Sequence, residues 1–227
     1  MNSTQALVIS VSLVVSSQVA SAQELSRYRV YMLESSVDAV VTSIGARATA
    51  AQTLHERPAK IQELQWRAPY ANPGSESVDP VRDIAFSFVN DALYQVLVTY
   101  DRDRTAGLTN DDLIESLSAS YGPPVLKSAI VRTDLPSTAL DDGTVLAQWS
   151  DAVASLTLVR DTYTPDFQLI LVSRALSAKA RSATREAVRL DALEAPQREL
   201  EQRKKDVAEA SATRDKTRSE NKAAFRP

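Results

Sequence analysis

The sequence contains no cysteine among its 227 residues. This absence excludes disulfide bonds, thiolate metal sites, cysteine nucleophiles and a lipid-anchored cysteine. An exported chain without disulfides has to rest on its hydrophobic core alone. Hydrophobic residues make up 44% of the chain, and its length allows one large domain, or two small ones, with a real core.

Histidine is almost as scarce, since His55 is the single example and lies in a polar segment, Leu54–Pro58. A Ser-His-Asp site would have to use this residue. The G-x-S-x-G turn that presents a nucleophilic serine occurs nowhere in the sequence. We therefore expect His55 to be a surface residue. A hydrolase is the least favoured reading, the protein is expected not to be an enzyme, and no cofactor is predicted.

Neither sign of charge dominates the whole chain, whose net charge is −3. The balance is uneven, because residues 175–227 hold 13 Lys and Arg against 9 Asp and Glu, whereas the rest holds 13 against 20. A body this acidic is not expected to bind nucleic acid. Mixed signs in the C-terminal part are typical of a solvated helix.

The N-terminus carries an uncharged apolar run, residues 6–15, followed by Ala20-Ser21-Ala22. Small residues at 20 and 22 fit a signal peptidase site, with cleavage before Gln23. The run is too short to span a bilayer, which needs about 20 apolar residues. The first basic residue is Arg27, so the usual positive start is weak. We predict a signal peptide, 1–22, and a periplasmic or secreted protein without a membrane span.

An internal repeat organises the body, residues 23–173. The first unit, about 29–100, contains a short strand at 30–32, a helix that ends at Gly45, and strands at 61–67, 82–89 and 92–100. The second, about 108–173, repeats the order with a helix over 109–122 and strands at 144–149, 152–160 and 167–173. Gln65-Trp66 in the first unit matches Gln148-Trp149 in the second. The pattern predicts two helix–strand–strand–strand units.

Alternation along these strands places apolar side chains on one face of the sheet. In the first unit they reach the same side only if the turn is an odd-length loop, 89–91, with Asp91 left-handed. The face comprises Ile84, Phe86, Phe88, Tyr94, Val96, Val98, Tyr100, and in the second unit Ala154, Leu156, Leu158, Phe167, Leu169 and Leu171. We therefore predict an α+β fold: an antiparallel sheet with the repeat helices on one face, followed by a long C-terminal helix.

The opposite face mixes polar and apolar side chains, which is the balance of a non-obligate protein interface. We select six of its residues as candidates for binding a partner: Gln95, Leu97, Thr99, Thr157, Gln168 and Ile170. The alternative is that the segment from Leu176 to Leu190 lies across this face and completes the core. The sequence alone leaves both open.

Residues 174–224 contain no glycine and a single proline, Pro196, so we expect one long helix with a kink. Its first half has a heptad seam, which consists of Leu176, Ala180, Ala183, Ala187 and Leu190. Beyond Pro196 the seam thins to Leu200 and Val207, and the pairs Glu199–Arg203 and Glu201–Lys205 support the helix instead. The first half should pack and the second should project. A two-chain coiled coil is possible, although the seam is short.

Two further features have competing interpretations. Loop 101–112 carries oxygen side chains at the spacing of a calcium loop, in Asp101, Asp103, Thr105, Thr109 and Asp112. Ala106 replaces the expected glycine, however, and a solvated connection to the next helix is favoured. Trp66 and Trp149 could anchor a partner, although core positions are favoured for both.

The helix that ends in glycine and the strands that follow it resemble the small outer-membrane assembly lipoproteins of the SmpA/OmlA type. Two such units in tandem resemble the secreted beta-lactamase inhibitor proteins. Residues 29–45 with 82–100, and 108–122 with 152–173, carry the likeness, but the lipoprotein cysteine and the disulfides are absent. The resemblance implies a protein-binding module and no catalytic residue.

A non-catalytic binding or assembly module of the cell envelope is thus the first prediction, with an envelope or secreted protein as its partner. The alternatives are a structural spacer that works through residues 174–227, a calcium-binding envelope protein that uses loop 101–112, and a hydrolase.

Overall fold

The computed structural model describes residues 24–45, 51–68, 79–129, 143–161, 164, 166–224 and 226. These residues form an eight-stranded antiparallel sheet, a two-stranded hairpin and three helices, so the predicted α+β class is confirmed. The predicted signal peptide and its cleavage site before Gln23 lie outside the described residues.

The predicted order of a helix and three strands recurs in both units, and each unit has one further short strand directly after its helix that the sequence did not predict. The first unit contains α1 (Val37–Ile44), β3 (Gln52–His55), β4 (Ile61–Arg67), β5 (Val81–Val89) and β6 (Ala92–Tyr100). The second contains α2 (Asn110–Tyr121), β7 (Leu126–Ala129), β8 (Thr144–Ser150), β9 (Ala154–Arg160) and β10 (Phe167–Ser173). The sheet order is β3-β4-β5-β6-β10-β9-β8-β7, so the two units meet at β6 and β10 in a palindromic arrangement.

Both repeat helices end at the glycines that the sequence predicts, and each has a capping side chain at its start. The Ser36 side chain accepts a hydrogen bond from the Ala39 N–H at the start of α1. The Thr109 side chain and Asp112 form a reciprocal capping box at the start of α2. Gly45 and Gly122 follow the two helices with φ values of 75° and 80°, a backbone region that glycine adopts without strain.

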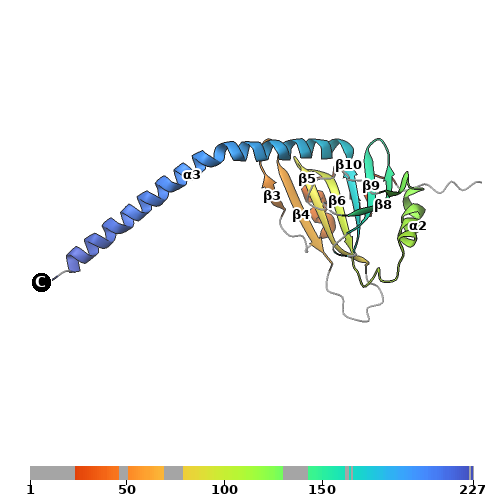
Figure 1. The fold of residues 1–227 in the computed structure, drawn as a ribbon, viewed down its shortest axis with the longest axis horizontal. Coiled ribbons are helices and arrows are strands. Elements are labelled where there is room, and N and C mark those ends of the chain that lie inside the picture. The colour runs from red at the N-terminus through yellow and green to blue at the C-terminus, as the bar shows by residue number, and fades with distance from the viewer. Residues whose placement is uncertain are drawn as a thin grey trace, which may run out of the picture.

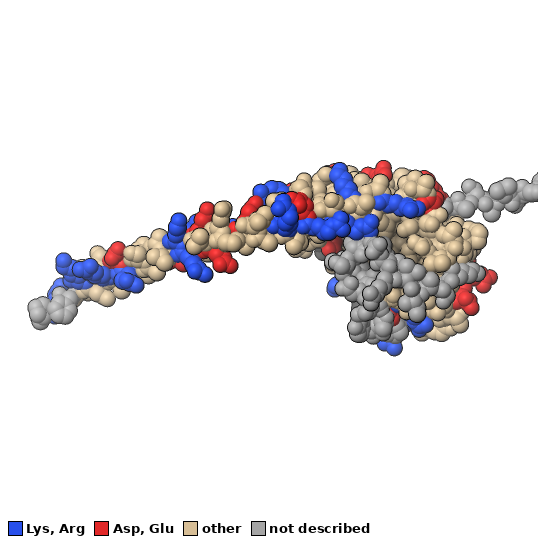
Figure 2. All heavy atoms as spheres, turned by 45° about the horizontal axis from the view of Figure 1, so that its top comes forward, with Lys and Arg blue, Asp and Glu red and all other residues tan. Residues whose placement is uncertain are grey.

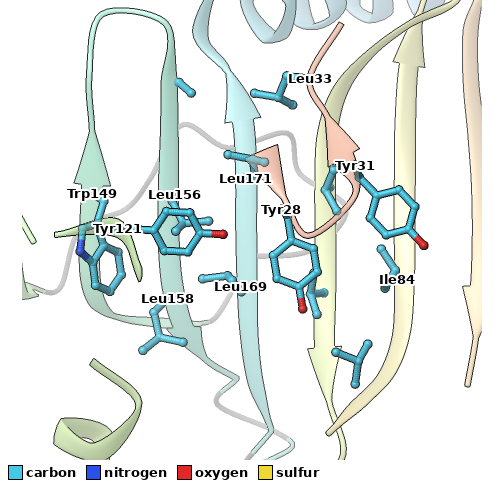
Figure 3. Packing of buried hydrophobic residues seen from close by; sticks show 14 of the residues in the cluster. Tyr28, Tyr31, Leu33, Ile84, Tyr121, Trp149, Leu156, Leu158, Leu169 and Leu171 are labelled. Atoms are coloured by element: carbon cyan, nitrogen blue, oxygen red, sulfur yellow. The ribbon is translucent and has the colours of Figure 1, made fainter. Parts of the chain in front are cut away.

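One core lies between these two helices and the sheet, and both units contribute to it (Figure 3). The N-terminal hairpin of β1 (Arg27–Tyr28) and β2 (Tyr31–Met32) adds two aromatic rings, of which Tyr31 packs edge-on against Phe86 at 4.7 Å between centroids. The Tyr121 hydroxyl donates to the Arg27 carbonyl at 3.1 Å, which ties the hairpin to α2. Every predicted core residue belongs to this cluster except Tyr94, with Tyr100 partly buried at its edge.

The turn between β5 and β6 corrects one prediction. It is a two-residue turn with positive φ at both Asn90 and Asp91, rather than a three-residue loop. The extra residue that the prediction placed in the turn is instead a bulge in β6. Ser87 lies opposite Gln95 while Phe88 lies opposite Leu93, so Tyr94 has no partner in β5. Asp91 is left-handed as predicted. The bulge moves Tyr94 to the opposite face of the sheet, where it packs in a second cluster.

Helix α3 (Arg174–Ala224) follows β10 directly and crosses the sheet on the face opposite α1 and α2. It then leaves the body, bends, and continues as a projecting arm (Figure 1). Pro196 lies inside the helix. Because proline lacks the N–H that would complete the helical hydrogen bond, it explains the predicted kink.

Candidate partner-binding surface

The first half of α3 is held against the body by small side chains. Ala180, Ala183 and Ala187 are 2%, 6% and 3% exposed, so the helix backbone approaches the sheet closely. Their neighbours are apolar residues near the ends of three strands and in the loop before β4, which are Ala59, Ile61, Val89 and Tyr94. The predicted seam is confirmed as the packing face of this half, and it packs on the chain's own sheet.

The six candidate binding residues share one face, as the alternation predicts, and they lie on the neighbouring strands β6, β10 and β9. Ile170 is opposite both Leu97 and Thr157, and Gln168 is opposite Thr99. This face is nevertheless not free. Gln95, Thr99, Thr157 and Ile170 are 5%, 4%, 1% and 1% exposed, while Leu97 and Gln168 are partly buried.

These exposures do not agree with the expectation of an exposed mixed face. The alternative gave residues 176–190 as the cover, but the first half of α3 packs on Ala59, Ile61, Val89 and Tyr94, a cluster that contains none of the six residues. Ile170 forms an apolar cluster with Val159 and Val172, against which Leu97 packs. The Oε1 atoms of Gln95 and Gln168 are buried and have no hydrogen-bond partner within the described parts of the chain. The prediction took polar side chains as a sign of exposure. Gln95, Thr99 and Thr157 are instead buried on the same face as apolar residues.

Ionic contacts mark the point where α3 leaves the body. The Arg57 guanidinium donates to both carboxylate oxygens of Glu194, at 3.0 and 3.2 Å. Arg198 pairs with Asp191 at 2.8 Å and lies 3.7 Å from Glu194. These contacts join the helix to the loop before β4 close to Pro196, so the arm begins at a defined place.

The distal arm, which we define as residues 195–224, is exposed at every position. At 1.5 Å per residue it is about 45 Å long. Leu193, just before the arm, and Leu200 and Val207 within it follow one another at intervals of seven residues and are 62%, 57% and 69% exposed. Seven residues are close to two helical turns, so these side chains form a single row, which we call the apolar row.

Charges of both signs are interspersed along α3 (Figure 2). The predicted pair of Glu199 and Arg203 is present at 3.8 Å. Closer to the body, the Arg189 guanidinium holds the pKa of the Glu186 carboxyl below its usual value through a hydrogen bond. The helix is therefore stabilised along its own surface.

Two hollows border the first half of α3. The larger, of about 670 Å³, is open and lies between Pro58 and a helix side that includes Lys179, Arg185 and Arg189. The smaller, of about 200 Å³, brings His55 near Asp191 and Arg57. No serine, threonine or cysteine is among the residues that line this smaller hollow in the described structure. The lining of neither hollow combines a nucleophile with the single histidine.

The carboxylates of loop 101–112 are engaged by backbone groups. Asp101 Oδ1 accepts hydrogen bonds from the N–H groups of Asp103 and Arg104, at 2.9 and 3.2 Å. Asp112 Oδ2 accepts from both the Thr109 N–H and its hydroxyl, each at 2.7 Å. Among the described residues, no group of three or more His, Cys, Asp or Glu could hold a metal ion. These contacts are those of a turn that leads into a capped helix.

The two tryptophans differ in burial. Trp149 is 1% exposed and its Nε1 donates to the Gly122 carbonyl at 2.7 Å, so it is a core residue that fixes the end of α2. Trp66 is partly buried and packs at the edge of the same core. Both positions agree with the favoured core interpretation.

No family model matches the chain, and neither a curated protein nor a solved structure does. The described helices include none that is both long enough and apolar enough to cross a membrane. Among the described residues, the distal arm is an extended element that the body does not cover.

Proposed function

We propose that this chain is an exported, non-catalytic binding module of the cell envelope that engages a protein partner through its distal arm. The observation that carries the proposal is the exposed apolar row of Leu193, Leu200 and Val207 on a helix that projects from the body. Isolated helices are marginally stable in water, because most helical stability in proteins comes from packing of an apolar face. A packing partner would supply that stability.

The body serves as the platform that orients the arm. Its helices and sheet enclose one shared core, and the first half of α3 is fixed on the sheet by buried alanines. The tie between Arg57 and Glu194 then sets where the arm departs. A rigid platform limits the directions in which the arm points, which lowers the entropy lost on binding.

Site-specific photo-crosslinking in the native host tests this proposal. A photoreactive amino acid at position 200 lies in the apolar row, whereas one at position 202 lies on nearly the opposite side of the same turn. We expect crosslinked products from position 200 and few from position 202. An arm that acts only as a spacer would give no specific product from either position, and this result would overturn the proposal.

A further inference from the structure

The net positive charge of α3 is concentrated in the half that packs on the body. Residues 174–190, which we call the proximal half, hold five basic residues and one acidic residue, whereas residues 191–224 hold eight of each. Residues 23–173 hold 12 basic and 20 acidic residues. The proximal half is therefore a basic segment between an acidic body and a stretch of helix whose charges cancel.

The arginines of the proximal half share the side of the helix that faces away from the sheet. We call these four residues the basic face: Arg174, Arg181, Arg185 and Arg189. At 3.6 residues per turn they fall within an arc of about 80°, and the buried alanines that pack on the sheet lie on the opposite side. Arg181 is partly buried and the other three are exposed. Arg174 also donates a hydrogen bond to the Asp151 carbonyl at 2.9 Å. Basic side chains can be followed along this half of the helix in Figure 2.

The larger hollow borders the basic face and adds to its positive charge. It opens between the helix and Pro58, and its lining includes Lys179, Arg185, Arg189 and Glu186. Glu186 is paired with Arg189 at 2.6 Å. Lys179 and Arg185 have no hydrogen-bond or ion-pair partner among the described residues. Two cations are thus available here to an anion from outside the chain.

We propose that the basic face binds an anionic lipid surface, with the proximal half of α3 lying along that surface. Guanidinium groups form paired, charge-assisted hydrogen bonds with phosphate oxygens. From Arg174 to Arg189 the face is about 22 Å long, so several headgroups can be contacted at once. Each basic residue close to an anionic membrane strengthens binding about fivefold. This inference goes beyond the proposed function, because it concerns another part of the helix and a lipid instead of a protein.

The composition of the basic face favours a lipid surface over a second protein. Protein interfaces have an apolar core, and a few large side chains supply most of the binding energy. Across residues 174–192 the one exposed large hydrophobic residue is Val188. The exposed residues beside the arginines are mostly small, and they include Ala178, Ser182 and Ala192. Charge without an apolar anchor is sufficient for attraction to an anionic membrane.

Co-sedimentation of the purified mature chain with lipid vesicles tests the proposal. We expect binding to vesicles that contain phosphatidylglycerol and none to vesicles of phosphatidylcholine alone. Binding should weaken as the salt concentration rises, because ions screen charges at a surface.

Two matched double variants locate the binding face. Arg185→Gln with Arg189→Gln removes two charges from the basic face and should weaken binding to the anionic vesicles about 30-fold. Arg214→Gln with Arg218→Gln removes the same charge, at the same spacing, from the distal arm and should have a much smaller effect. All four positions are exposed, so both variants should keep the circular dichroism spectrum of the wild type.

A wild-type chain that does not bind the anionic vesicles would overturn the proposal, as would equal losses of binding in the two folded double variants. The proposed function is tested separately, because the vesicles contain no protein and crosslinking from position 200 reports on the arm. A chain that crosslinks from position 200 but ignores the vesicles would refute the lipid surface alone. A chain that binds the vesicles but gives no crosslinked product would refute the protein partner alone.

Discussion

Ile170 shows that the burial of a side chain depends on its neighbours in the fold and cannot be inferred from the alternation of polar and apolar residues. It lies opposite Thr157 and Leu97 and is 1% exposed, although polar residues alternate around it. Ile170→Glu would place an unpaired charge inside this face. We expect a loss of about 3–5 kcal/mol in the free energy of unfolding, as for an uncompensated buried charge. Urea denaturation followed by circular dichroism measures this loss.

Val153 provides the matched control, because it is apolar, lies immediately before the neighbouring strand β9 and is 55% exposed. Val153→Glu should change the free energy of unfolding by no more than about 0.5 kcal/mol. A folded Ile170→Glu protein with unchanged stability would show that this face is free, and would return the six residues to consideration as a binding surface.

Buried tyrosines give the body a distinct response to alkali. Burial raises the pKa of Tyr28, with a further rise from Tyr100 beside it, and burial raises the pKa of Tyr121 to about 12. The folded state therefore holds these protons more tightly than the unfolded state, in which tyrosine has a pKa of about 10. Their contribution to stability is complete below pH 10 and is lost as the pH rises above it.

Spectrophotometric titration of the phenolates tests this expectation. Tyr28 and Tyr121 should not ionise near pH 10, and they should ionise only together with unfolding at higher pH. Tyr121→Phe should remove one late-titrating group, and it should also cost stability because the hydrogen bond to the Arg27 carbonyl is lost. Ionisation of all tyrosines near pH 10 in a still-folded protein would contradict the packing described for the hairpin and α2.

At the level of elements, the two halves of α3 differ in how they are stabilised. Its first half is bound by buried alanines, whereas residues 195–224 bury almost nothing. Deleting 198–227 should therefore cost the body no more than about 1 kcal/mol. Thermal unfolding of the truncated and full chains measures the difference, and a large fall in melting temperature would mean that the arm contributes to the core.

Hydrogen exchange offers a second view of the same division. In the purified chain, residues 174–194 should be protected while residues 200–224 exchange fast, because few buried contacts hold them. Equal protection along the whole helix would contradict the division at Pro196.

The elements also show what sequence reasoning could reach. The long strands and the helices were predictable because their apolar spacing and capping residues are strong local signals. Strands β3 and β7 were missed, since they are four residues long and lie at the sheet edges; Gln52, Thr53 and Leu54 of β3 are exposed, so no alternation marks them. The bulge near Tyr94 was missed because it depends on cross-strand pairing.

The repeat was recognised correctly in its order and incompletely in its register. The repeat also aligns Phe86–Asp91 with Leu156–Asp161 in the sequence. Trp66 lies opposite Ile84, whereas Trp149 lies opposite Leu156, the residue aligned with Phe86. The two units therefore differ by one pleat in how their strands pair. Short sequence matches reveal composition and order, but register depends on turns and bulges in each unit.

On the scale of the whole molecule, the described side chains of the central strands are mostly buried, whereas residues 195–224 are exposed. The structure leaves the arm, rather than the sheet face, as the exposed candidate surface. Alternation in the sequence shows which side chains share a face of the sheet, but it does not show whether other parts of the chain cover that face. The apolar row was visible in the sequence only as a thinning seam of Leu200 and Val207, and the structure shows that both side chains are exposed.

The central claim is that the apolar row of the arm binds a protein partner. Its most direct test is the native size of the protein in gently solubilised envelopes from the host, compared between wild type, Leu200→Glu and Thr213→Glu, which introduces the same charge on the side of the arm opposite the apolar row. The account predicts that wild type and Thr213→Glu migrate as a species larger than one chain, and that Leu200→Glu migrates as a single folded chain. A Leu200→Glu protein that keeps the wild-type size, or a wild type that is already a single chain, would contradict it.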